Sequence, residues 1–244
     1  MQWMLRPTSL SRKMSPIAMT NVDRPLGLGE ILAETVRLYG ERFWAGVALG
    51  VVYTAAIAGA AIIHDALYFL VAAFMVAGAY AGAARLAVGD SFGEAWGQVA
   101  VRLPVILVLA LVVGLPFVLA TSYLVFLLIA AAWIGLIGFA VPVAVLEREG
   151  EKSNFAARIA YALERALALA RTDLLHAAGV AAALVFVNYL LAIVLGGALT
   201  GFGENSQAVA VLLAQVVLAP FFFFGLVILY FEQKARAVSS RPRN

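Results

Sequence analysis

The chain has 244 residues, of which 64% are hydrophobic and only 13% are charged, and it contains no cysteine. Soluble domains carry about 25% charged residues, so the composition excludes a water-soluble domain of this size and makes the bilayer the solvent. The net charge of +3 combines 17 cations with 14 acids, which argues against nucleic-acid binding, and the lack of cysteine excludes disulfides, thiolate metal sites and cysteine nucleophiles.

The N-terminal stretch 1–26 is a basic, polar tail, which we expect to be mobile. It lacks the apolar core of a cleaved signal peptide, so the first span is expected to act as an uncleaved signal anchor. A helix is predicted from Leu28 to Phe43, because its apolar residues share one face while Glu30, Glu34 and Arg37 share the opposite face. An amphipathic helix of this kind, beside a span, can lie in the headgroup plane.

The first two spans are predicted from Trp44 to Ile63 and from about Ala66 to Ala84, since a span needs about 20 apolar residues. Only the dipeptide His64-Asp65 separates them, which predicts a tight turn on the outer side of the membrane. We interpret His64 as a polar turn residue; the alternative is a ligand for a pigment or a metal. No metal site is predicted, because one histidine beside one aspartate supplies too few ligands.

Glycine pairs four residues apart mark both of these spans. Gly46 and Gly50 lie on one face of the first span, and Gly78 and Gly82 lie on one face of the second. Small residues at this spacing let helix backbones approach closely in a membrane. The pattern predicts close packing of this pair of spans, with a homodimer face as the alternative.

The next uncharged stretch, from Leu103 to Leu146, is too long for one span. A single helix would measure about 66 Å, twice the thickness of the hydrocarbon core. The chain is therefore expected to fold back near Thr121-Ser122, just after Pro116. A second, weaker amphipathic helix is predicted ahead of this stretch, from Ser91 to Arg102, and Trp133 is expected to pack inside the bundle or against a membrane partner.

A third amphipathic helix is predicted from Phe155 to Arg171, followed by spans at about Leu174 to Thr200 and about Gln207 to Phe231. Asn188 and Gln215 lie within these two spans, where lipid offers an amide no hydrogen-bond partner. Each is interpreted as making an interhelical hydrogen bond or, alternatively, as a polar contact for a substrate. His176, beside Asp173 at the start of the fifth span, is interpreted as an interfacial residue; the alternatives are a proton relay or pH sensor, or, as for His64, a ligand for a pigment or a metal.

The order of these elements suggests one unit used three times, at roughly 27–87, 90–146 and 153–231. We predict an all-α integral membrane protein with six transmembrane helices arranged as three hairpins, each preceded by a cytoplasmic amphipathic helix. A single membrane domain would cover 27–236, with a basic C-terminal tail at 237–244. All 17 Lys and Arg residues lie before the first span or after the second, fourth or sixth, so both termini are expected in the cytoplasm.

Three stretches carry a resemblance to a known family: Arg24-Pro25-Leu26-Gly27-Leu28-Gly29-Glu30-Ile31-Leu32 with Arg37-Leu38-Tyr39; Val141-Pro142-Val143-Ala144-Val145-Leu146-Glu147 with 162–169; and Pro220-Phe221 with Leu229-Tyr230-Phe231-Glu232 and Arg236. They resemble a prokaryotic six-span family labelled as the glycerophosphoryl diester phosphodiesterase membrane domain. The chain departs from that family's pattern at Glu232, where Asp is usual, and at Ala166, where Ser is usual.

The resemblance implies a six-span fold in the prokaryotic cytoplasmic (inner) membrane. It implies no phosphodiesterase activity, because that chemistry resides in a separate soluble barrel with a His-Arg motif. Neither His64 nor His176 is followed by Arg.

The first functional hypothesis is a non-enzymatic membrane protein, acting as a scaffold, an accessory subunit of a membrane complex, or an organiser of lipid and protein. The alternative is a small carrier or lipid transporter that uses Asn188, Gln215 and proline kinks at Pro142 and Pro220; spans without formal charges argue against a proton-coupled pump or an ion channel. An enzyme ranks third, and its reactive groups would come from His64, Asp65, Glu147, Asp173 and His176. No cofactor is predicted, and the expected partners are bound lipid and other membrane proteins or a second copy.

Overall fold

The structure, a computed structural model, describes residues 26–121, 126–147, 154–199 and 206–239, and these ranges contain helices and no strands. The helices are α1 (Leu28–Glu41), α2 (Phe43–Ile63), α3 (Asp65–Ala87), α4 (Phe92–Val101), α5 (Leu103–Leu109), the π-helix η2 (Ala110–Gly114), α6 (Leu115–Thr121), α7 (Leu127–Leu136), α8 (Ala140–Leu146), α9 (Phe155–Ala170), α10 (Leu174–Leu199) and α11 (Ser206–Ser239). The expected N-terminal tail up to residue 25, the end of the C-terminal tail and the turn residue Ser122 lie outside the described residues.

Six helical stretches are long and apolar enough to cross a membrane, which confirms the prediction of an all-helical protein with six candidate spans. They are Phe43–Ile63, Asp65–Ala87, Leu103–Ala120, Leu127–Leu146, Leu174–Leu195 and Val209–Ser239. Most residues of the first and fifth are not buried by the rest of the chain, whereas most residues of the second, fourth and sixth are. The first and fifth therefore offer the largest surfaces to lipid.

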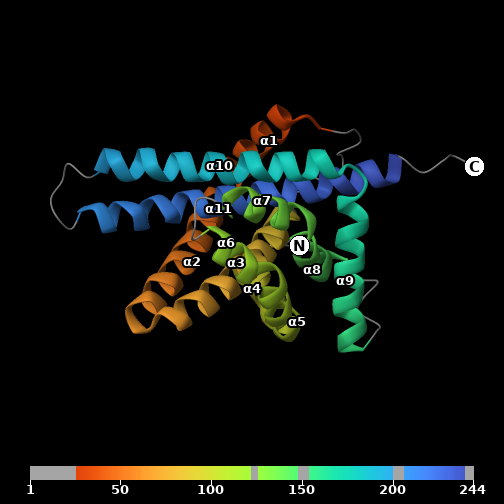
Figure 1. Ribbon diagram of the computed structural model, residues 1–244, viewed down its shortest axis with the longest axis horizontal. Helices are drawn as coiled ribbons and strands as arrows, with labels where there is room; N and C mark the ends of the chain where they lie inside the picture. Colours follow the sequence, from red (N-terminus) through yellow and green to blue (C-terminus); the bar gives the residue numbers. More distant parts are fainter. Residues whose placement is uncertain (1–25, 122–125, 148–153, 200–205, 240–244) are drawn as a thin grey trace, which may run out of the picture.

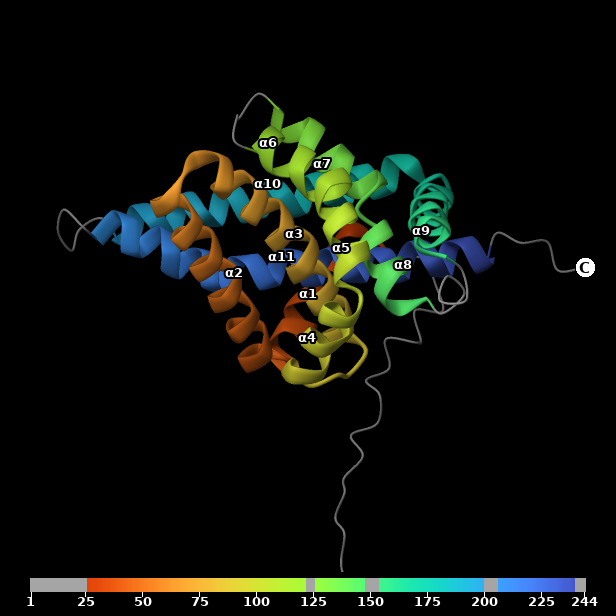
Figure 2. The same ribbon diagram turned by 90° about the horizontal axis from the view of Figure 1, so that it is seen from below.

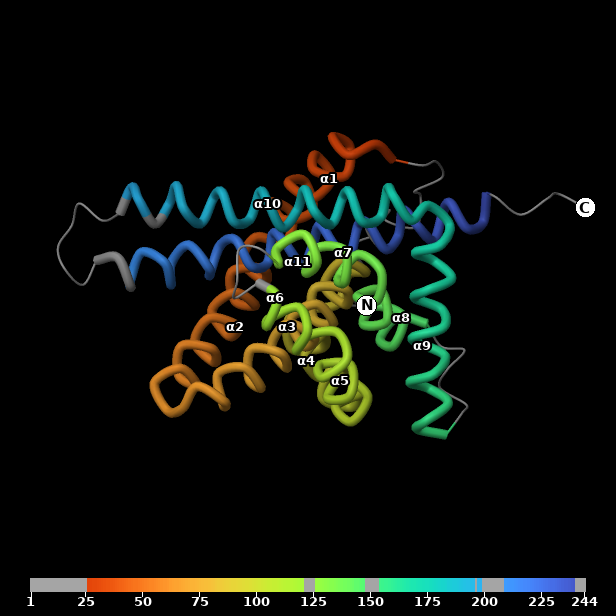
Figure 3. Tube along the Cα trace, in the orientation of Figure 1, coloured from red at the N-terminus to blue at the C-terminus, as the bar shows by residue number. Residues whose placement is uncertain are grey.

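Helices α10 and α11 lie side by side along the longest axis of the molecule (Figure 1), and α2 and α3 run obliquely away from them. Helix α9 stands across the pair near the start of α10 and the second half of α11, as the view from below also shows (Figure 2). The Cα trace shows α11 passing behind the short helices of the third and fourth spans (Figure 3). Helix α11 contacts α10, α2, α1, α3 and α9, and α3 contacts α2, α4, α5, α6, α8, η2 and α11, so these two helices form the centre of the fold.

The third span is irregular because of Pro116. Proline has no N–H, so the carbonyl four residues earlier, that of Val112, loses its helical partner. The chain forms the π-helix η2 at this point, and the indole Nε1 of Trp133 on α7 donates to the Val112 oxygen at 3.1 Å. Trp133 is therefore bound to the third span inside the protein, and it satisfies a carbonyl that proline leaves free.

The fourth span breaks between α7 and α8, ahead of Pro142. The carbonyl of Gly138, four residues before Pro142, accepts a shorter-range bond from Val141 N at 3.0 Å. The span therefore consists of two short helices joined by a turn at residues 137–139.

The sixth span stays continuous through Pro220 but makes an unusually close contact there. The carbonyl freed by Pro220 is that of Val216, and Gly50 of α2 lies directly against it: a Cβ at Gly50 would fall 1.9 Å from the Val216 oxygen. Only glycine lets the two backbones meet at this distance, and a Cα–H contact to the free carbonyl is the natural interaction there.

The four glycines of the first two spans lie in different environments. Gly50 faces α11, whereas a Cβ at Gly46 would meet the side chains of Tyr39 and Phe224. A Cβ at Gly82 would meet Leu49 of α2 at 3.3 Å, and one at Gly78 would meet Trp96 of α4 at 3.9 Å. The closest of these approaches thus joins α2 to α11 rather than α2 to α3.

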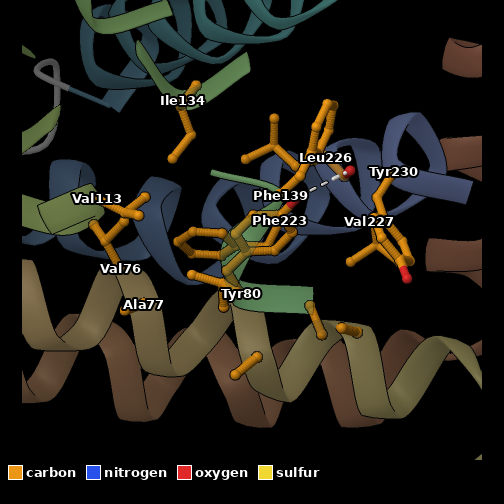
Figure 4. Close-up of a cluster of buried hydrophobic side chains, with 14 of the residues drawn as sticks. Val76, Ala77, Tyr80, Val113, Ile134, Phe139, Phe223, Leu226, Val227 and Tyr230 are labelled. Carbon is orange, nitrogen blue, oxygen red and sulfur yellow. Dashed lines mark hydrogen bonds between the residues drawn. The ribbon is translucent and has the colours of Figure 1, made fainter. Parts of the chain in front are cut away.

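The part of the core shown in Figure 4 lies where α3, η2, α7, the turn before α8 and α11 meet. Tyr80 of α3 is fully buried, and its hydroxyl donates to the Leu226 carbonyl of α11 at 3.1 Å, the dashed line in Figure 4. Its ring stacks on Phe223 with centroids 6.3 Å apart. Alanine and glycine line most of the facing surface of α3, so the two helices approach closely around these rings.

Helices α1, α4 and α9 have polar starts. Ser91 and Glu94 form a reciprocal capping box at α4, and Asn154 Oδ1 accepts from Ala157 N at the start of α9. At the start of α1, Glu30 Oε2 accepts a hydrogen bond from Gly27 N at 2.9 Å, and the helix buries Ile31 and Leu38. These caps fix where each of the helices begins.

Candidate functional site

A cavity of about 200 Å³ lies between α2, α6, α7, α10 and α11. Its walls include Tyr53 of α2, Phe117 of α6, Asn188 and Tyr189 of α10, and Gln215 of α11. Asn188 and Gln215, the two amides recognised in the sequence, therefore lie in the wall of one cavity. None of the described lining residues carries a formal charge.

The carbonyl oxygen of the Asn188 side chain is buried and has no hydrogen-bond partner within the described residues. An unpaired buried acceptor costs about 1–3 kcal/mol, so such groups are rare in folded proteins. Since Asn188 lines the cavity, a molecule inside the cavity is well placed to supply the missing donor.

Aromatic rings form one side of the cavity. Phe117 and Phe222 stack with centroids 5.8 Å apart and planes 17° apart, and Phe223 packs edge-on against Phe222 at 5.4 Å and against Tyr53 at 5.6 Å. Apolar and aromatic walls with a few polar groups are the usual composition of a small-molecule site.

A second cavity, of about 140 Å³, shares two wall residues, Tyr53 and Phe117, with the first. These two residues line both cavities, and the second is completed by Tyr68, Val76 and other residues of α2, α3 and α6. The two spaces are therefore neighbours that share two aromatic wall residues.

The other end of α11 is charged and tightly paired. Glu147, directly after α8, accepts hydrogen bonds of 2.9 Å from the hydroxyls of both Tyr161 and Tyr230. It also lies 3.1 Å from Lys234 Nζ and 3.4 Å from Arg165 Nε, and its side chain is only 8% exposed. We call these five residues the Glu147 cluster; it joins α8, α9 and α11.

A second group of charges lies on the same turns of α11. Glu232 is fully buried; it pairs with Arg236 and accepts from Gln233 Nε2 at 3.0 Å, and its Oε2 lies 3.6 Å from His176 Nε2. Arg236 also pairs with Asp173 at 2.8 Å and reaches the Leu26 carbonyl at 3.4 Å. We call Asp173, His176, Glu232, Gln233 and Arg236 the Glu232 cluster; it joins α10, α11 and the segment before α1.

The pKa of Glu147 reflects two opposing effects. Burial raises it, but hydrogen bonds from Lys234, Tyr161 and Tyr230 stabilise the carboxylate more strongly, so the net pKa lies below the ordinary value. Glu147 is therefore an ionised structural anchor at neutral pH and is poorly suited to act as a general acid.

The two histidines lie at different ends of the spans. His64 is exposed at the α2–α3 turn, where its Nδ1 accepts from Ala66 N at 3.1 Å and so caps α3. His176 donates its backbone N–H to Asp173 Oδ1 at 3.1 Å, at the start of α10. The described residues contain no group of three or more metal-ligating side chains.

The five residues considered for an enzyme do not form one site. His64 and Asp65 lie at the α2–α3 turn, Glu147 belongs to one charged cluster, and Asp173 and His176 belong to the other. The Glu232 cluster was missed by sequence reasoning, although the spacing of Glu232 and Arg236, four residues apart after an apolar span, is the usual signal for an ion pair on a helix.

No protein-family model, no curated protein and no solved structure matches this chain. The resemblance to the phosphodiesterase membrane-domain family therefore stays a prediction, and the cavity and the two charged clusters are the features from which a function can be argued.

Proposed function

We propose that the protein is a non-enzymatic integral membrane protein that binds a lipid-like molecule in the cavity beside Asn188 and Gln215, as a lipid organiser or carrier. The observation that carries this proposal is the unpaired Asn188 oxygen in an otherwise aromatic, uncharged cavity within the span region. A membrane-dissolved molecule with one polar group fits such a space, because it offers a partner to the amide and apolar surface to the rings.

The proposed topology is three units, each an amphipathic helix followed by a transmembrane hairpin, with both termini in the cytoplasm of a prokaryotic cell. The positive-inside distribution of Lys and Arg supports this orientation. Helices α1, α4 and α9 would then lie at the cytoplasmic headgroups, and both charged clusters would lie at the cytoplasmic ends of the spans. The cavity would lie nearer the outer side.

A carrier role is favoured by the helix irregularities around the cavity. Pro116 directly precedes Phe117, and Pro220 directly follows Ala219; both of these neighbours line the cavity. Proline and π-helical turns weaken the local hydrogen-bond ladder, so these helices bend there at lower cost than elsewhere.

A scaffold or accessory-subunit role is the second candidate, and the surface of α9 favours it. Phe155 and Leu167 on this helix are 49% and 38% exposed. In the proposed topology they face the cytoplasmic headgroup region, where lipid or another membrane protein would cover them.

Filling the cavity tests the proposal. Ala192 lines the cavity, so Ala192→Phe should occupy the space, whereas Ala198→Phe changes an exposed position of the same helix. After extensive detergent exchange, the wild type and Ala198→Phe should retain a small apolar molecule detectable by native mass spectrometry. Ala192→Phe should lose it while keeping its unfolding temperature. Equal retention by both variants, or none by the wild type even after bacterial lipid extract is added back, would overturn the proposal.

A further inference from the structure

The ligand of this cavity can be specified further from the groups that surround it, an inference that rests on the proposed function. We infer that the cavity takes a neutral lipid alcohol: its hydroxyl binds at Asn188 and Gln215, and its chain passes Tyr53 and Phe117 into the second cavity.

The charge of the ligand follows from the walls. The described residues that line the two cavities are aliphatic or aromatic, apart from the two amides and the tyrosine hydroxyls. A carboxylate, phosphate or ammonium group placed there would lose its hydration without gaining a counter-charge, which is strongly unfavourable. The polar group of the ligand is therefore uncharged.

The nature of the polar group follows from Asn188. Its buried side-chain oxygen is an acceptor without a partner, so the ligand must present a donor. A hydroxyl also accepts a bond, which the amide of Gln215 in the same wall can donate. An ether, a ketone or a hydrocarbon offers no donor and would leave the Asn188 oxygen unpaired.

The path of the ligand's alkyl chain follows from the residues that the two cavities share. Tyr53 and Phe117 line both spaces, so an alkyl chain that extends from one cavity into the other passes these two side chains. Beyond them, Ala72 and Val76 of α3 offer apolar walls. At about 30 Å³ for each water-sized group, the two spaces hold on the order of ten non-hydrogen atoms, so a medium-length chain fills them.

Photoaffinity labelling of the full chain in lipid nanodiscs tests this inference. The probes are decan-1-ol derivatives with a diazirine next to the head or at the chain end, with matched methyl ether, alkane and carboxylate versions. The alcohol should label the protein in a manner that unlabelled decanol competes away, roughly tenfold more efficiently than the ether or alkane, as one hydrogen bond predicts. The head-proximal diazirine should map near Asn188 or Gln215, and the terminal one near Tyr68 or Val76.

Each alternative outcome has a distinct meaning. Equal labelling by alcohol, ether and alkane would overturn the donor requirement but leave the cavity as a lipid site. Equal labelling by the carboxylate would overturn the neutral head, and reversed mapping of the two diazirines would overturn the path. If no probe labelled either cavity, the proposed function itself would fail.

A pair of variants supplies a second readout. Asn188→Leu should reduce labelling by the alcohol about tenfold without changing labelling by the alkane, because only the hydrogen bond is lost. Phe186→Leu, at an exposed position of the same helix, should change neither. A loss that is equal for the alcohol and the alkane would show that Asn188 acts only by shaping the cavity, and it would overturn its role as the acceptor.

Discussion

The two halves of α11 differ in the partners that their polar side chains have. Its first half presents Gln215 to a cavity whose other amide, Asn188, has an unpaired oxygen. Its second half carries Glu232, Lys234 and Arg236, and these side chains are paired with Glu147 directly after α8, with Asp173 and His176 at the start of α10, and with the segment before α1. The charged groups at one end of the helix are ion-paired, whereas the amide at the other end faces a cavity.

The charged end of α11 is expected to contribute mainly to stability, and the cavity end mainly to function. Buried charges that are fully paired hold elements together and are costly to disturb, whereas an unpaired polar group beside a cavity is a cost that a bound molecule can remove. We expect substitutions at the charged end to change the free energy of unfolding and those at the cavity to change binding. Variants at both ends of α11, and at two backbone contacts between the spans, test this division.

Loss of the buried Glu232 carboxylate should have the largest effect. Glu232→Ala leaves Arg236 and Gln233 without their shared partner, which should lower the free energy of unfolding by about 3–5 kcal/mol. Chemical unfolding in detergent micelles measures it. Glu164→Ala, at an exposed position of α9, is the control and should change little. Similar results for the two variants would contradict the structural role of the Glu232 cluster.

The α2–α11 crossing should tolerate no side chain at Gly50. A Cβ there would fall 1.9 Å from the Val216 oxygen, so Gly50→Ala must push the helices apart, at a cost of about 1–3 kcal/mol or more. Gly59→Ala is a matched control in the same helix, because nothing lies within 4 Å of a Cβ at that position. The unfolding temperatures of the two variants test this prediction. If Gly50→Ala were as stable as the control, α2 and α11 would not cross at Gly50.

Trp133 should stabilise the protein mainly through the hydrogen bond that its indole N–H donates. Trp133→Phe keeps an aromatic ring but leaves the Val112 carbonyl without a partner, which should cost about 1–3 kcal/mol. Trp44→Phe changes a side chain that is 80% exposed and serves as the control. If both substitutions had the same small effect on the unfolding temperature, the hydrogen bond to the third span would be unimportant.

Stability should also depend on pH through Glu147. Its folded-state pKa lies below the ordinary value of 4.5, so the stabilisation is complete above that value and is lost as pH falls through the folded-state pKa. Unfolding midpoints measured between neutral pH and about pH 3 should fall at the acid end. Glu147→Gln should flatten this part of the profile, and an unchanged acid slope in that variant would assign the effect to other carboxylates.

Asn188→Leu should have the smallest effect on stability. Unlike the other substitutions, it should not lower the free energy of unfolding. Removing an unpaired buried oxygen should leave the free energy of unfolding unchanged or raise it by up to about 1 kcal/mol, while ligand binding falls. Unfolding measured with the cavity emptied by detergent exchange checks this. A clear loss of stability would mean that Asn188 has a structural partner.

The sequence was sufficient to predict the six apolar spans, because a run of about 20 uncharged, apolar residues matches the thickness of the hydrocarbon core and is rare in soluble domains. It also predicted that the long apolar stretch holds two spans, since one candidate span ends at Ala120 and the next begins at Leu127. Hydropathy could not predict which helices meet. The Gly46 and Gly50 spacing indicates a close contact, but only the three-dimensional arrangement shows that Gly50 meets the carbonyl freed by Pro220.

The candidate site was predictable in its parts but not as a whole. Asn188 and Gln215 stand out because amides are rare within spans, yet nothing in their spacing indicates that they share a cavity with Tyr53 and Phe117. The Glu147 cluster joins side chains up to 87 positions apart in the sequence, from Glu147 to Lys234. A single sequence contains no signal for such contacts beyond the presence of charges near the span ends.

The central position of α11 has a consequence for how the protein is made. A ribosome releases the chain from its N-terminus, so α1, α2, α3 and α9 enter the membrane region before the helix that they all contact exists. Until α11 arrives, Glu147 lacks Lys234, Asp173 lacks Arg236, and Gly50 faces lipid or another protein. The contacts of α1, α2, α3, α9 and α10 with α11 are therefore the last of the fold to form.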